Sequence, residues 1–486
     1  MASAEVVRTR TGVYHDSVSL MRVSRTASAL PGVEVAVVAM ATELNLQIVS
    51  ELGFDLPRAG PADLLIALRG AADTLEAASA ELDGLLAALS APSSGGGGDA
   101  ERPARTVRAA ARESAAGLAL VSVPGRHAFA EALDAVEAGL SVMIFSDNVP
   151  IEQEVLLKRR AAERGVLVMG PDCGTAVIGG AGLGFANVLR PGPVGLVAAS
   201  GTGAQQVTCL LDLAGVGVSH VLGVGGRDLS ADVGGLSTLR ALEALDADPA
   251  TELIVLISKP PAPQVARTVE EAVARLGTPV VTALLGPGQA DLTSVTEAAL
   301  RALGVPIPTW PSWPAPGTPD APAASRRLPG TGDPGTEGTE GTEGNVRGIY
   351  SGGTLCVEAR LIAGTGEFTD FGDDAYTVGR AHPMIDPTLR LEALAEVPPG
   401  DVVLLDVVLG HGSDPDPSAR LAPAIAEAVA GGVTAVVALV GSEGDPQGLA
   451  AQAGALNAAG AAVFTSNAEA AGYAARAATG ITANAR

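Results

Sequence analysis

The chain has 486 residues, 47% of them hydrophobic and only 3% aromatic, with a formal net charge of −23. That length predicts three or four domains, and the abundance of Ala, Val, Leu and Gly is typical of layered α/β folds. The negative charge argues against nucleic acid or anionic lipid as a partner, and no apolar run approaches the ~18 residues of a membrane span. No signal peptide is recognisable, and the three cysteines are odd in number and far apart, which predicts a reducing, cytoplasmic location.

The first 90 residues alternate between strand and helix patterns, which predicts a small N-terminal α/β domain at residues 1–90. Residues 91–103 include four consecutive glycines, and this composition predicts a flexible linker. The expected strands of the domain are Glu5–Arg10, Val33–Met40 and Ala62–Arg69, and its expected helices are His15–Ser28, Thr42–Leu52 and Ala72–Leu89.

Residues 104–192 have the pattern of a second α/β domain, with Leu118–Val123, Ser141–Phe145 and Val166–Met169 as expected strands. Consecutive α/β units predict parallel sheets covered on both faces, with ligands bound at the carboxyl ends of the strands. The candidate functional residues at such a strand exit are Ser146, Asp147 and Asn148.

A strand–turn–helix signature then occurs twice, ~150 residues apart, which predicts two copies of one α/β unit. These units are residues 193–304 and 346–486. A Ser-Gly turn between a buried strand and a helix points free backbone N–H groups beyond the strand end, and this geometry favours an anion site. The candidate phosphate-binding residues are Ser200, Gly201, Thr202 and Gly203 in the first copy and Ser351, Gly352, Gly353 and Thr354 in the second.

Between the two copies, residues 305–345 are rich in Pro and Gly and include a threefold Gly-Thr-Glu repeat. Low complexity with little apolar content predicts a disordered tether.

Lysine occurs only at Lys158 and Lys259, and Lys259 follows the apolar strand Leu253–Ile257. It is either a solvated surface residue or an anion-binding residue at the ligand edge of the sheet. His382 is a candidate general acid–base or substrate contact, whereas nearby Asp386 is expected to cap a helix. His411 and Cys173 are weaker candidates, and no cluster has metal-ligand spacing, so no metal is predicted.

Residues 118–260 resemble the α subunit of succinyl-CoA synthetase. The stretch from Val121-Ser122-Val123-Pro124 to Gly170-Pro171-Asp172-Cys173 resembles its CoA-binding domain. Ser200-Gly201-Thr202 and Gly223-Val224-Gly225-Gly226 resemble its ligase domain, and residues 346–480 resemble a ligase domain as well. The resemblance implies a Rossmann-like CoA-binding domain at 104–192 and two flavodoxin-like ligase domains. CoA is then a possible cofactor, with Ser146, Asp147 and Asn148 as candidate contacts.

The whole chain, with Gly379-Arg380-Ala381-His382-Pro383-Met384-Ile385-Asp386-Pro387, resembles the FdrA family, whose members are often named acyl-CoA synthetases. Some FdrA-like proteins act with companion subunits as oxamate carbamoyltransferase in anaerobic allantoin breakdown. Their net reaction exchanges oxalurate plus phosphate for oxamate plus carbamoyl phosphate. The resemblance therefore implies a small acyl phosphate or carboxylate substrate, companion subunits and a homo-oligomer.

Three departures from the synthetase pattern favour carbamoyl transfer. The region near Arg105–Glu113 is an Arg/Ala-rich helix without the synthetase's glycine-rich CoA turn. The segment Leu285–Gln289 has no histidine where the synthetase has a phosphorylated one, and Lys259 stands where the synthetase has a glutamate. Two other hypotheses stay open: an acyl-CoA synthetase working with an ATP-binding partner, and a non-catalytic scaffold that binds acyl phosphate or CoA.

Overall fold

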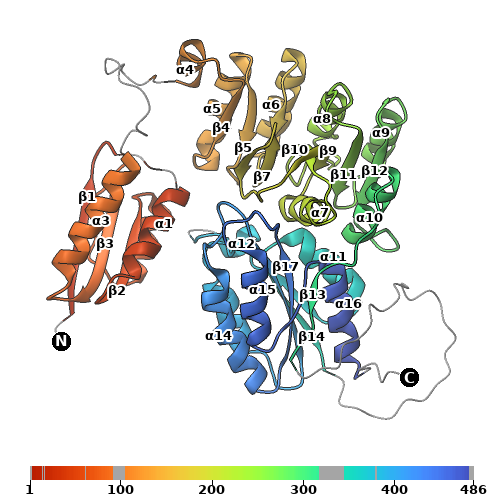
Figure 1. The fold of residues 1–486 in the computed structure, drawn as a ribbon. Coiled ribbons are helices and arrows are strands. Elements are labelled where there is room, and N and C mark those ends of the chain that lie inside the picture. Colours follow the sequence, from red (N-terminus) through yellow and green to blue (C-terminus); the bar gives the residue numbers. More distant parts are fainter. Residues whose placement is uncertain are drawn as a thin grey trace. The chain divides into compact units, whose positions relative to one another are not determined.

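The computed structural model describes residues 3–13, 15, 17–60, 62–90, 104, 106–316, 344–377 and 380–480. The chain forms two compact units (Figure 1): Met1–Ala104 with Val378–Ala381, and Arg105–Thr377 with His382–Arg486. The predicted linker at 91–103 lies outside the described residues.

The N-terminal unit is a three-stranded sheet of order β1-β3-β2 with helices packed on it. The central strand β3 is buried on both faces, since Ile66 belongs to one apolar cluster and Leu65 to another. Both strand pairs run antiparallel, so the expectation of parallel sheets is wrong for this unit. Its elements are β1 (Ser3–Arg10), α1 (Ser17–Ser28), β2 (Val33–Met40), α2 (Glu43–Glu51), β3 (Leu64–Ala71) and α3 (Leu75–Ser90).

The second unit begins with a three-stranded parallel sheet of order β4-β5-β6. An Ala-rich face of α5 packs into its core, because small side chains let a helix approach a sheet closely. The elements are α4 (Val107–Glu113), β4 (Leu118–Val121), α5 (Gly125–Glu137), β5 (Ser141–Ile144), α6 (Ile151–Arg164) and β6 (Val168–Met169).

The first repeat copy lies in a six-stranded sheet of order β12-β11-β9-β10-β7-β8, whose strands β7 and β8 come from residues 175–184, ahead of the copy's predicted start at residue 193. Strands β9 to β12 pair in parallel, and the antiparallel hairpin β7–β8 extends the edge beyond β10. The elements are β7 (Thr175–Ile178), β8 (Ala181–Gly184), β9 (Pro191–Ala198), α7 (Gly201–Leu213), β10 (Val218–Gly223), α8 (Leu236–Asp246), β11 (Leu253–Ser258), α9 (Pro263–Val273), β12 (Val280–Leu284) and α10 (Leu292–Ala302).

The second copy forms a six-stranded sheet of order β13-β18-β17-β16-β14-β15, parallel except for β13. Its strands are β13 (Ser312–Trp313), β14 (Val346–Tyr350), β15 (Glu367–Asp370), β16 (Val402–Val408), β17 (Thr434–Val440) and β18 (Ala462–Phe464). Its helices are α11 (Gly353–Ala363), α12 (Asp374–Thr377), α13 (Thr388–Ala395), α14 (Pro417–Ala430), α15 (Leu449–Ala458) and α16 (Asn467–Ala478).

The expected tether is wrong at its start. Both tryptophans of the chain lie there: Trp310 is buried and donates from Nε1 to Glu297 Oε1 at 3.2 Å, and Trp313 belongs to β13. Burial of a large aromatic side chain offsets the loss of chain entropy when this stretch becomes ordered. The high Pro and Gly content of the sequence made this ordered stretch difficult to predict. Residues 317–343, which include the Gly-Thr-Glu repeat, lie outside the described residues.

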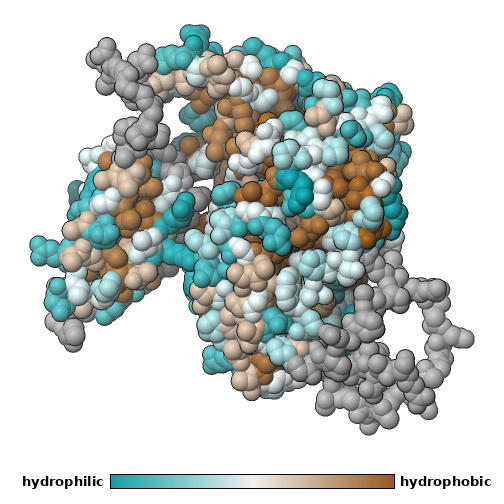
Figure 2. All heavy atoms as spheres, viewed as in Figure 1, coloured by the Kyte–Doolittle hydropathy of each residue, from teal (hydrophilic) through white to brown (hydrophobic). Residues whose placement is uncertain are grey.

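The fold class is α/β, as the sequence predicts. Apolar strands lie under helices, while the face shown in Figure 2 mixes hydrophilic and apolar side chains. Among the described residues, no helix combines the length and the apolar character required to cross a membrane.

Candidate functional site

The two Ser-Gly turns of the repeat meet in the second unit. Ser200 Oγ donates to Thr354 Oγ1 at 2.6 Å, although 154 residues separate them in the sequence. A methyl group on Gly352 would lie within 3 Å of three Thr202 side-chain atoms, so the helix starts are in direct contact. Figure 1 shows α7 and α11 lying where the two six-stranded sheets approach each other. One chain thus brings both candidate phosphate-binding segments together.

The two helix starts differ in their capping. Ser200 is the N-cap of α7 and its Oγ accepts from Gly203 N at 3.0 Å. Gly352, the N-cap of α11, has no side chain that can do this. The amides of Gly353 and Thr354 donate to no residue in the described part of the chain. Free amides at a helix start carry partial positive charge, so α11 offers the more open anion site.

Ser351 does not face this site, although the sequence nominated it. It is buried, and both its backbone N–H and its Oγ donate to Asp406, at 2.7 and 3.0 Å. Asp406 also forms a buried ion pair with Arg390 at 3.0 Å. Arg390 Nε has no partner among the described residues and lines a cavity about the size of one water molecule. Asp406 and Arg390 therefore stabilise the Ser-Gly turn from the interior of the protein.

Lys259 approaches the start of α11 from the end of β11. It is exposed and forms no hydrogen bond or ion pair with the residues that the structure describes. A methyl group on Gly353 would lie 3.8 Å from Lys259 Nζ and 2.5 Å from Asp370 Oδ2. A cation and a carboxyl group therefore converge on the same uncapped helix start.

Asp370, the last residue of β15, was missed by the sequence analysis. Its Oδ1 accepts from Gly372 N at 2.9 Å. Partial burial, and next the charge of Asp406, raise the pKa of Asp370 to about 6, against the opposing effects of the Gly372 hydrogen bond and Lys259. Its position at the end of a strand was the available signal, but β15 is short and half-buried and its pattern is weak.

His382 and Asp370 lie on the same side of Gly372. A methyl group on Gly372 would be 3.0 Å from His382 Nε2 and 3.1 Å from Asp370 Oδ1. Burial, with a smaller effect of Arg390, lowers the pKa of His382 to about 4, so the ring is neutral at pH 7. Met384 N donates to His382 Nδ1 at 3.3 Å, which assigns the proton to Nε2. His382 is thus a hydrogen-bond donor and a poor acid at neutral pH.

The strand exits of the Rossmann-like sheet add a second group of carboxylates. Ser146 is buried, whereas Asp147 and Asn148 are exposed. Asp172 is exposed as well. Desolvation by the surrounding chain, followed by the charges of Asp374 and Asp147, raises its pKa to about 6. Arg227 and Lys259 oppose this shift. Lys259 therefore lies within electrostatic reach of both strand-exit regions.

The contacts of the weaker candidates indicate structural roles. The predicted cap is displaced by one residue: Pro387, not Asp386, is the N-cap of α13, and Asp386 accepts from Thr388 N and Oγ1, at 3.2 and 2.7 Å, just before the helix. His411 exchanges backbone hydrogen bonds with Ala186. Burial raises the pKa of Cys173 to about 12, so its thiol stays protonated and is no nucleophile.

Lys158, the other lysine, is fully buried. Its Nζ donates to Glu154 Oε1 at 2.8 Å, Asp228 Oδ1 at 2.7 Å and Val224 O at 3.0 Å. Asp228 in turn accepts from the amides of Ser237 and Thr238 at the start of α8. This lysine ties α6 to the loop after β10, so it has a structural role and Lys259 is the lysine exposed at the site.

Comparisons with known proteins agree with parts of the sequence resemblance. A family model described as an AllF heavy metal-associated domain matches residues 1–103, and a CoA-ligase model matches residues 349–477. The protein YahF of Escherichia coli (strain K12) is 38% identical over 461 residues, which is 86% of each chain.

Enzyme subunits are similar to smaller parts of the chain. The succinate–CoA ligase [ADP-forming] subunit alpha 2 of Archaeoglobus fulgidus is 30% identical over 158 residues, 32% of this chain and 54% of that subunit. Among solved structures, the alignment with the dinucleotide-forming acetyl-coenzyme A synthetase 1 of Ca. Korarchaeum cryptofilum covers 77% of this chain and 84% of that one. Its 18% identity and TM-score of 0.29 are too low to support an inference.

The N-terminal unit does not fit a heavy-metal site. Soft metal ions select thiolate ligands, and residues 1–103 contain no cysteine and a single histidine, His15. In the described ranges no group of three or more His, Cys, Asp or Glu residues is arranged to hold a metal ion.

Proposed function

The chain belongs to the succinyl-CoA synthetase-like, CoA-ligase family of YahF, and from this premise we propose that it is a subunit of an oxamate carbamoyltransferase. Together with companion subunits, it would interconvert oxalurate plus phosphate with oxamate plus carbamoyl phosphate. The observation that carries this proposal is the contact between the two helix starts, with Lys259 beside the uncapped one.

The chemistry of the reactants suits this arrangement. Oxalurate and oxamate each carry a carboxylate, and the other reactant is phosphate or an acyl phosphate, so two anionic groups must be held close together. Two helix N-termini in contact supply partial positive charge toward two anions, and the Lys259 ammonium supplies a full one. Holding the reactants in this way lowers the entropic part of the barrier.

The residues around α11 have distinct roles in this proposal. The amides of Gly353 and Thr354 and the Lys259 ammonium bind the phosphoryl group. His382, with its proton on Nε2, donates a hydrogen bond to the carbonyl oxygen where negative charge develops. The chain supplies no phosphohistidine in Leu285–Gln289, and direct transfer between phosphate and amide nitrogen needs none.

The proposal is tested with the full chain co-purified with the proteins encoded beside it. We expect oxamate to be required for the release of phosphate from carbamoyl phosphate, measured by colorimetric phosphate assay after subtraction of the spontaneous breakdown. Oxamide, in which a neutral amide replaces the carboxylate of oxamate, is the matched control acceptor. Equal phosphate release with and without oxamate would contradict the proposal.

The second candidate function is acid–thiol ligation, and the CoA-ligase match over residues 349–477 favours it. It predicts formation of an acyl-CoA thioester that depends on ATP, CoA and a carboxylic acid, with a partner that supplies the ATP-binding domain. Thioester formation followed by mass spectrometry, with a screen of small dicarboxylates, separates the two functions.

A further inference from the structure

We propose that Asp370 is the acid–base residue of this site: its carboxylic acid protonates the nitrogen that leaves the carbamoyl carbon, and the resulting carboxylate takes the proton of the attacking phosphate. The inference rests on the carbamoyl transfer proposed above. It concerns a residue on β15 that no repeat or motif singles out.

The position of Asp370 is defined by two glycines. Its Oδ1 accepts from Gly372 N at 2.9 Å, which holds the carboxyl group at the strand exit. Its Oδ2 occupies the space beside Gly353, where a methyl group would approach it to 2.5 Å. Asp370 therefore presents one oxygen to the protein and the other to the uncapped start of α11.

The neighbouring groups divide the remaining work. Lys259 Nζ lies near the same point of α11, where it can bind an anion, and His382 Nε2 lies beside Gly372 close to Asp370 as a neutral donor. His382 is a poor proton source for a leaving nitrogen, since a neutral imidazole is a very weak acid, and Lys259 is already assigned to binding the anion. Cys356, in the first turn of α11, keeps its proton because burial raises the pKa of its thiol to about 12. Among the described groups at this helix start, Asp370 is the one that titrates near neutral pH.

The protonation state of Asp370 suits the task. Its pKa of about 6 comes mainly from burial and from Asp406, while Asp373 raises it further and Lys259 lowers it. A bound phosphate would add negative charge next to Asp370 and raise the pKa again. A carboxyl group with a pKa near the working pH exchanges protons in both directions.

The step balances without a further reactant. A bond forms between a phosphate oxygen and the carbamoyl carbon of oxalurate, and the bond from that carbon to nitrogen breaks. The electron pair of the broken bond stays on nitrogen, which takes the Asp370 proton and leaves as the amide of oxamate. The proton of hydrogen phosphate passes to the Asp370 carboxylate, so the acid is restored. Both directions therefore start from the protonated acid.

The first experiment compares wild type and Asp370→Asn in the full complex. The amide oxygen can still accept from Gly372 N, so the variant keeps the local hydrogen bond. We expect oxamate-dependent turnover to fall about 100-fold in Asp370→Asn. Wild-type turnover should decrease as the pH rises to about 6 and above, and the residual turnover of the variant should not show this decrease. Turnover within threefold of wild type overturns the acid–base role and leaves the proposed function standing.

A second readout does not depend on turnover. Sulfate keeps a constant charge between pH 5 and 8, so the pH dependence of its affinity reports on the protein. We expect wild type to bind sulfate about fivefold more weakly at pH 8 than at pH 5, because ionised Asp370 repels the anion, and Asp370→Asn to lose most of this dependence. Asp172→Asn is the matched control, since Asp172 titrates in the same range near Lys259.

The two failures can be told apart. If wild type shows no oxamate-dependent turnover, the proposed function is wrong, and the sulfate titration still judges the placement of Asp370. Equal pH dependence in wild type and Asp370→Asn would overturn that placement. Circular dichroism of each variant confirms that the fold is retained.

Discussion

Gly352 and Gly353 stand side by side at the start of α11 but face different neighbours. A methyl group on Gly352 would meet the Thr202 side chain at 2.5 to 2.8 Å, inside the contact between the helices. A methyl group on Gly353 would meet only the end of the Asp370 side chain, with Lys259 Nζ next. Neither backbone needs a positive φ. The two positions therefore separate packing from site chemistry.

We expect Gly352→Ala to destabilise the fold by about 1–3 kcal/mol, because Thr202 and its helix must shift. Gly353→Ala should change the free energy of unfolding by less than about 0.5 kcal/mol, since only a flexible carboxylate moves, while carbamoyl phosphate binding weakens about tenfold. Chemical denaturation and calorimetry measure the two effects. The opposite pattern, with Gly353→Ala destabilised and still binding normally, would contradict this assignment.

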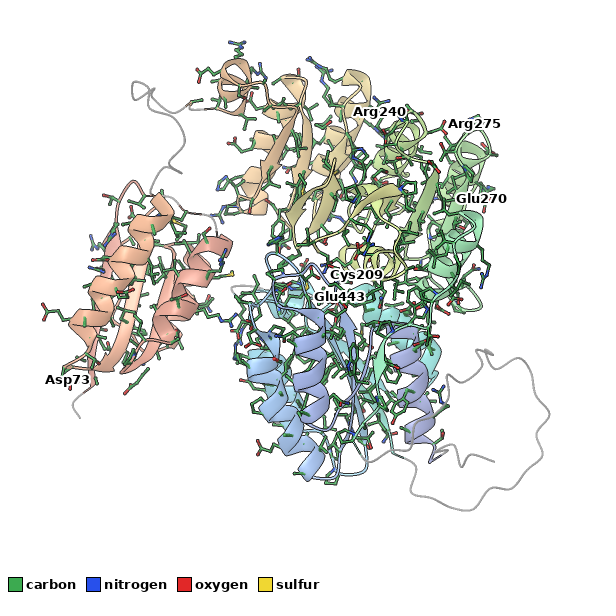
Figure 3. The ribbon with its side chains drawn as sticks, in the orientation of Figure 1. Asp73, Cys209, Arg240, Glu270, Arg275 and Glu443 are labelled. Atoms are coloured by element: carbon green, nitrogen blue, oxygen red, sulfur yellow. The ribbon has the colours of Figure 1, made fainter. Side chains whose placement is uncertain are left out.

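Lys259 offers a test of charge without a stability effect. It is exposed and pairs with no residue of the described segments, so its removal breaks no contact. We expect Lys259→Gln to weaken phosphate binding about tenfold at low salt, less in high salt, and to leave thermal stability unchanged. Arg240→Gln, on α8 (Figure 3), is the control for loss of one surface charge. Equal effects of the two variants on binding would sink the proposed role of Lys259.

At the scale of elements, the junction of α10, α11 and α16 contains a buried carboxyl group. Glu358 on α11 accepts from Leu292 N at the start of α10, at 2.6 Å, and from Asn467 Nδ2 at the start of α16, at 2.7 Å. Burial raises the pKa of Glu358 to about 7, and Asp291 raises it further, although these two hydrogen bonds oppose the shift. One carboxyl group thus joins three helices.

The sign of its effect on stability follows from linkage. Because the folded pKa lies above the unfolded value near 4.5, the contribution of Glu358 is fully present below pH 4.5 and is lost as pH rises through about 7. We expect the unfolding free energy of wild type to drop between pH 5.5 and 8 by about 2 kcal/mol more than that of Glu358→Gln. The Gln variant starts lower, by about 1 kcal/mol, since its NH₂ faces a donor. Parallel pH curves for the two proteins would refute the role of Glu358.

The regular elements were predictable because their patterns are local. The strands Val33–Met40 and Val402–Val408 begin and end where their apolar runs do. The site was predictable only where it repeats: the two Ser-Gly turns were found because they recur, but their contact comes from the packing of α7 on α11. Asp370 gave only a weak signal, its position at the end of a short strand, because its role depends on two glycines that fold beside it. Ser351 looked like its counterpart Ser200, and only the buried Asp406 turns it inward.

At the scale of the whole second unit, α7 is the element that both repeat copies share. Its residues from Thr202 to Asp212 are all buried. Gln206 Nε2 donates to Thr465 O at 3.0 Å, and Gln206 Oε1 accepts from Asn467 N at 2.9 Å. Cys209 of α7, labelled in Figure 3, lies within electrostatic reach of Asp445, which follows β17 in the second copy. The pairing of the two repeat copies is therefore made within one chain.

This pairing should survive a cut in the chain. Residues 317–343 have the composition of a tether, so a site-specific protease sequence placed there leaves Trp310 and the start of β14 intact. We expect the cleaved fragments to elute together in size-exclusion chromatography and to keep phosphate affinity within twofold, because the buried face of α7 holds them in contact. The variant Gln206→Leu deletes both of this residue's hydrogen bonds across the contact and leaves a buried amide and a buried carbonyl unpaired. We expect it to raise the dissociation constant of the cleaved fragments at least tenfold. If the cleaved fragments that keep Gln206 separate at micromolar concentration, then the covalent connection, and not the helix contact, keeps the two turns together.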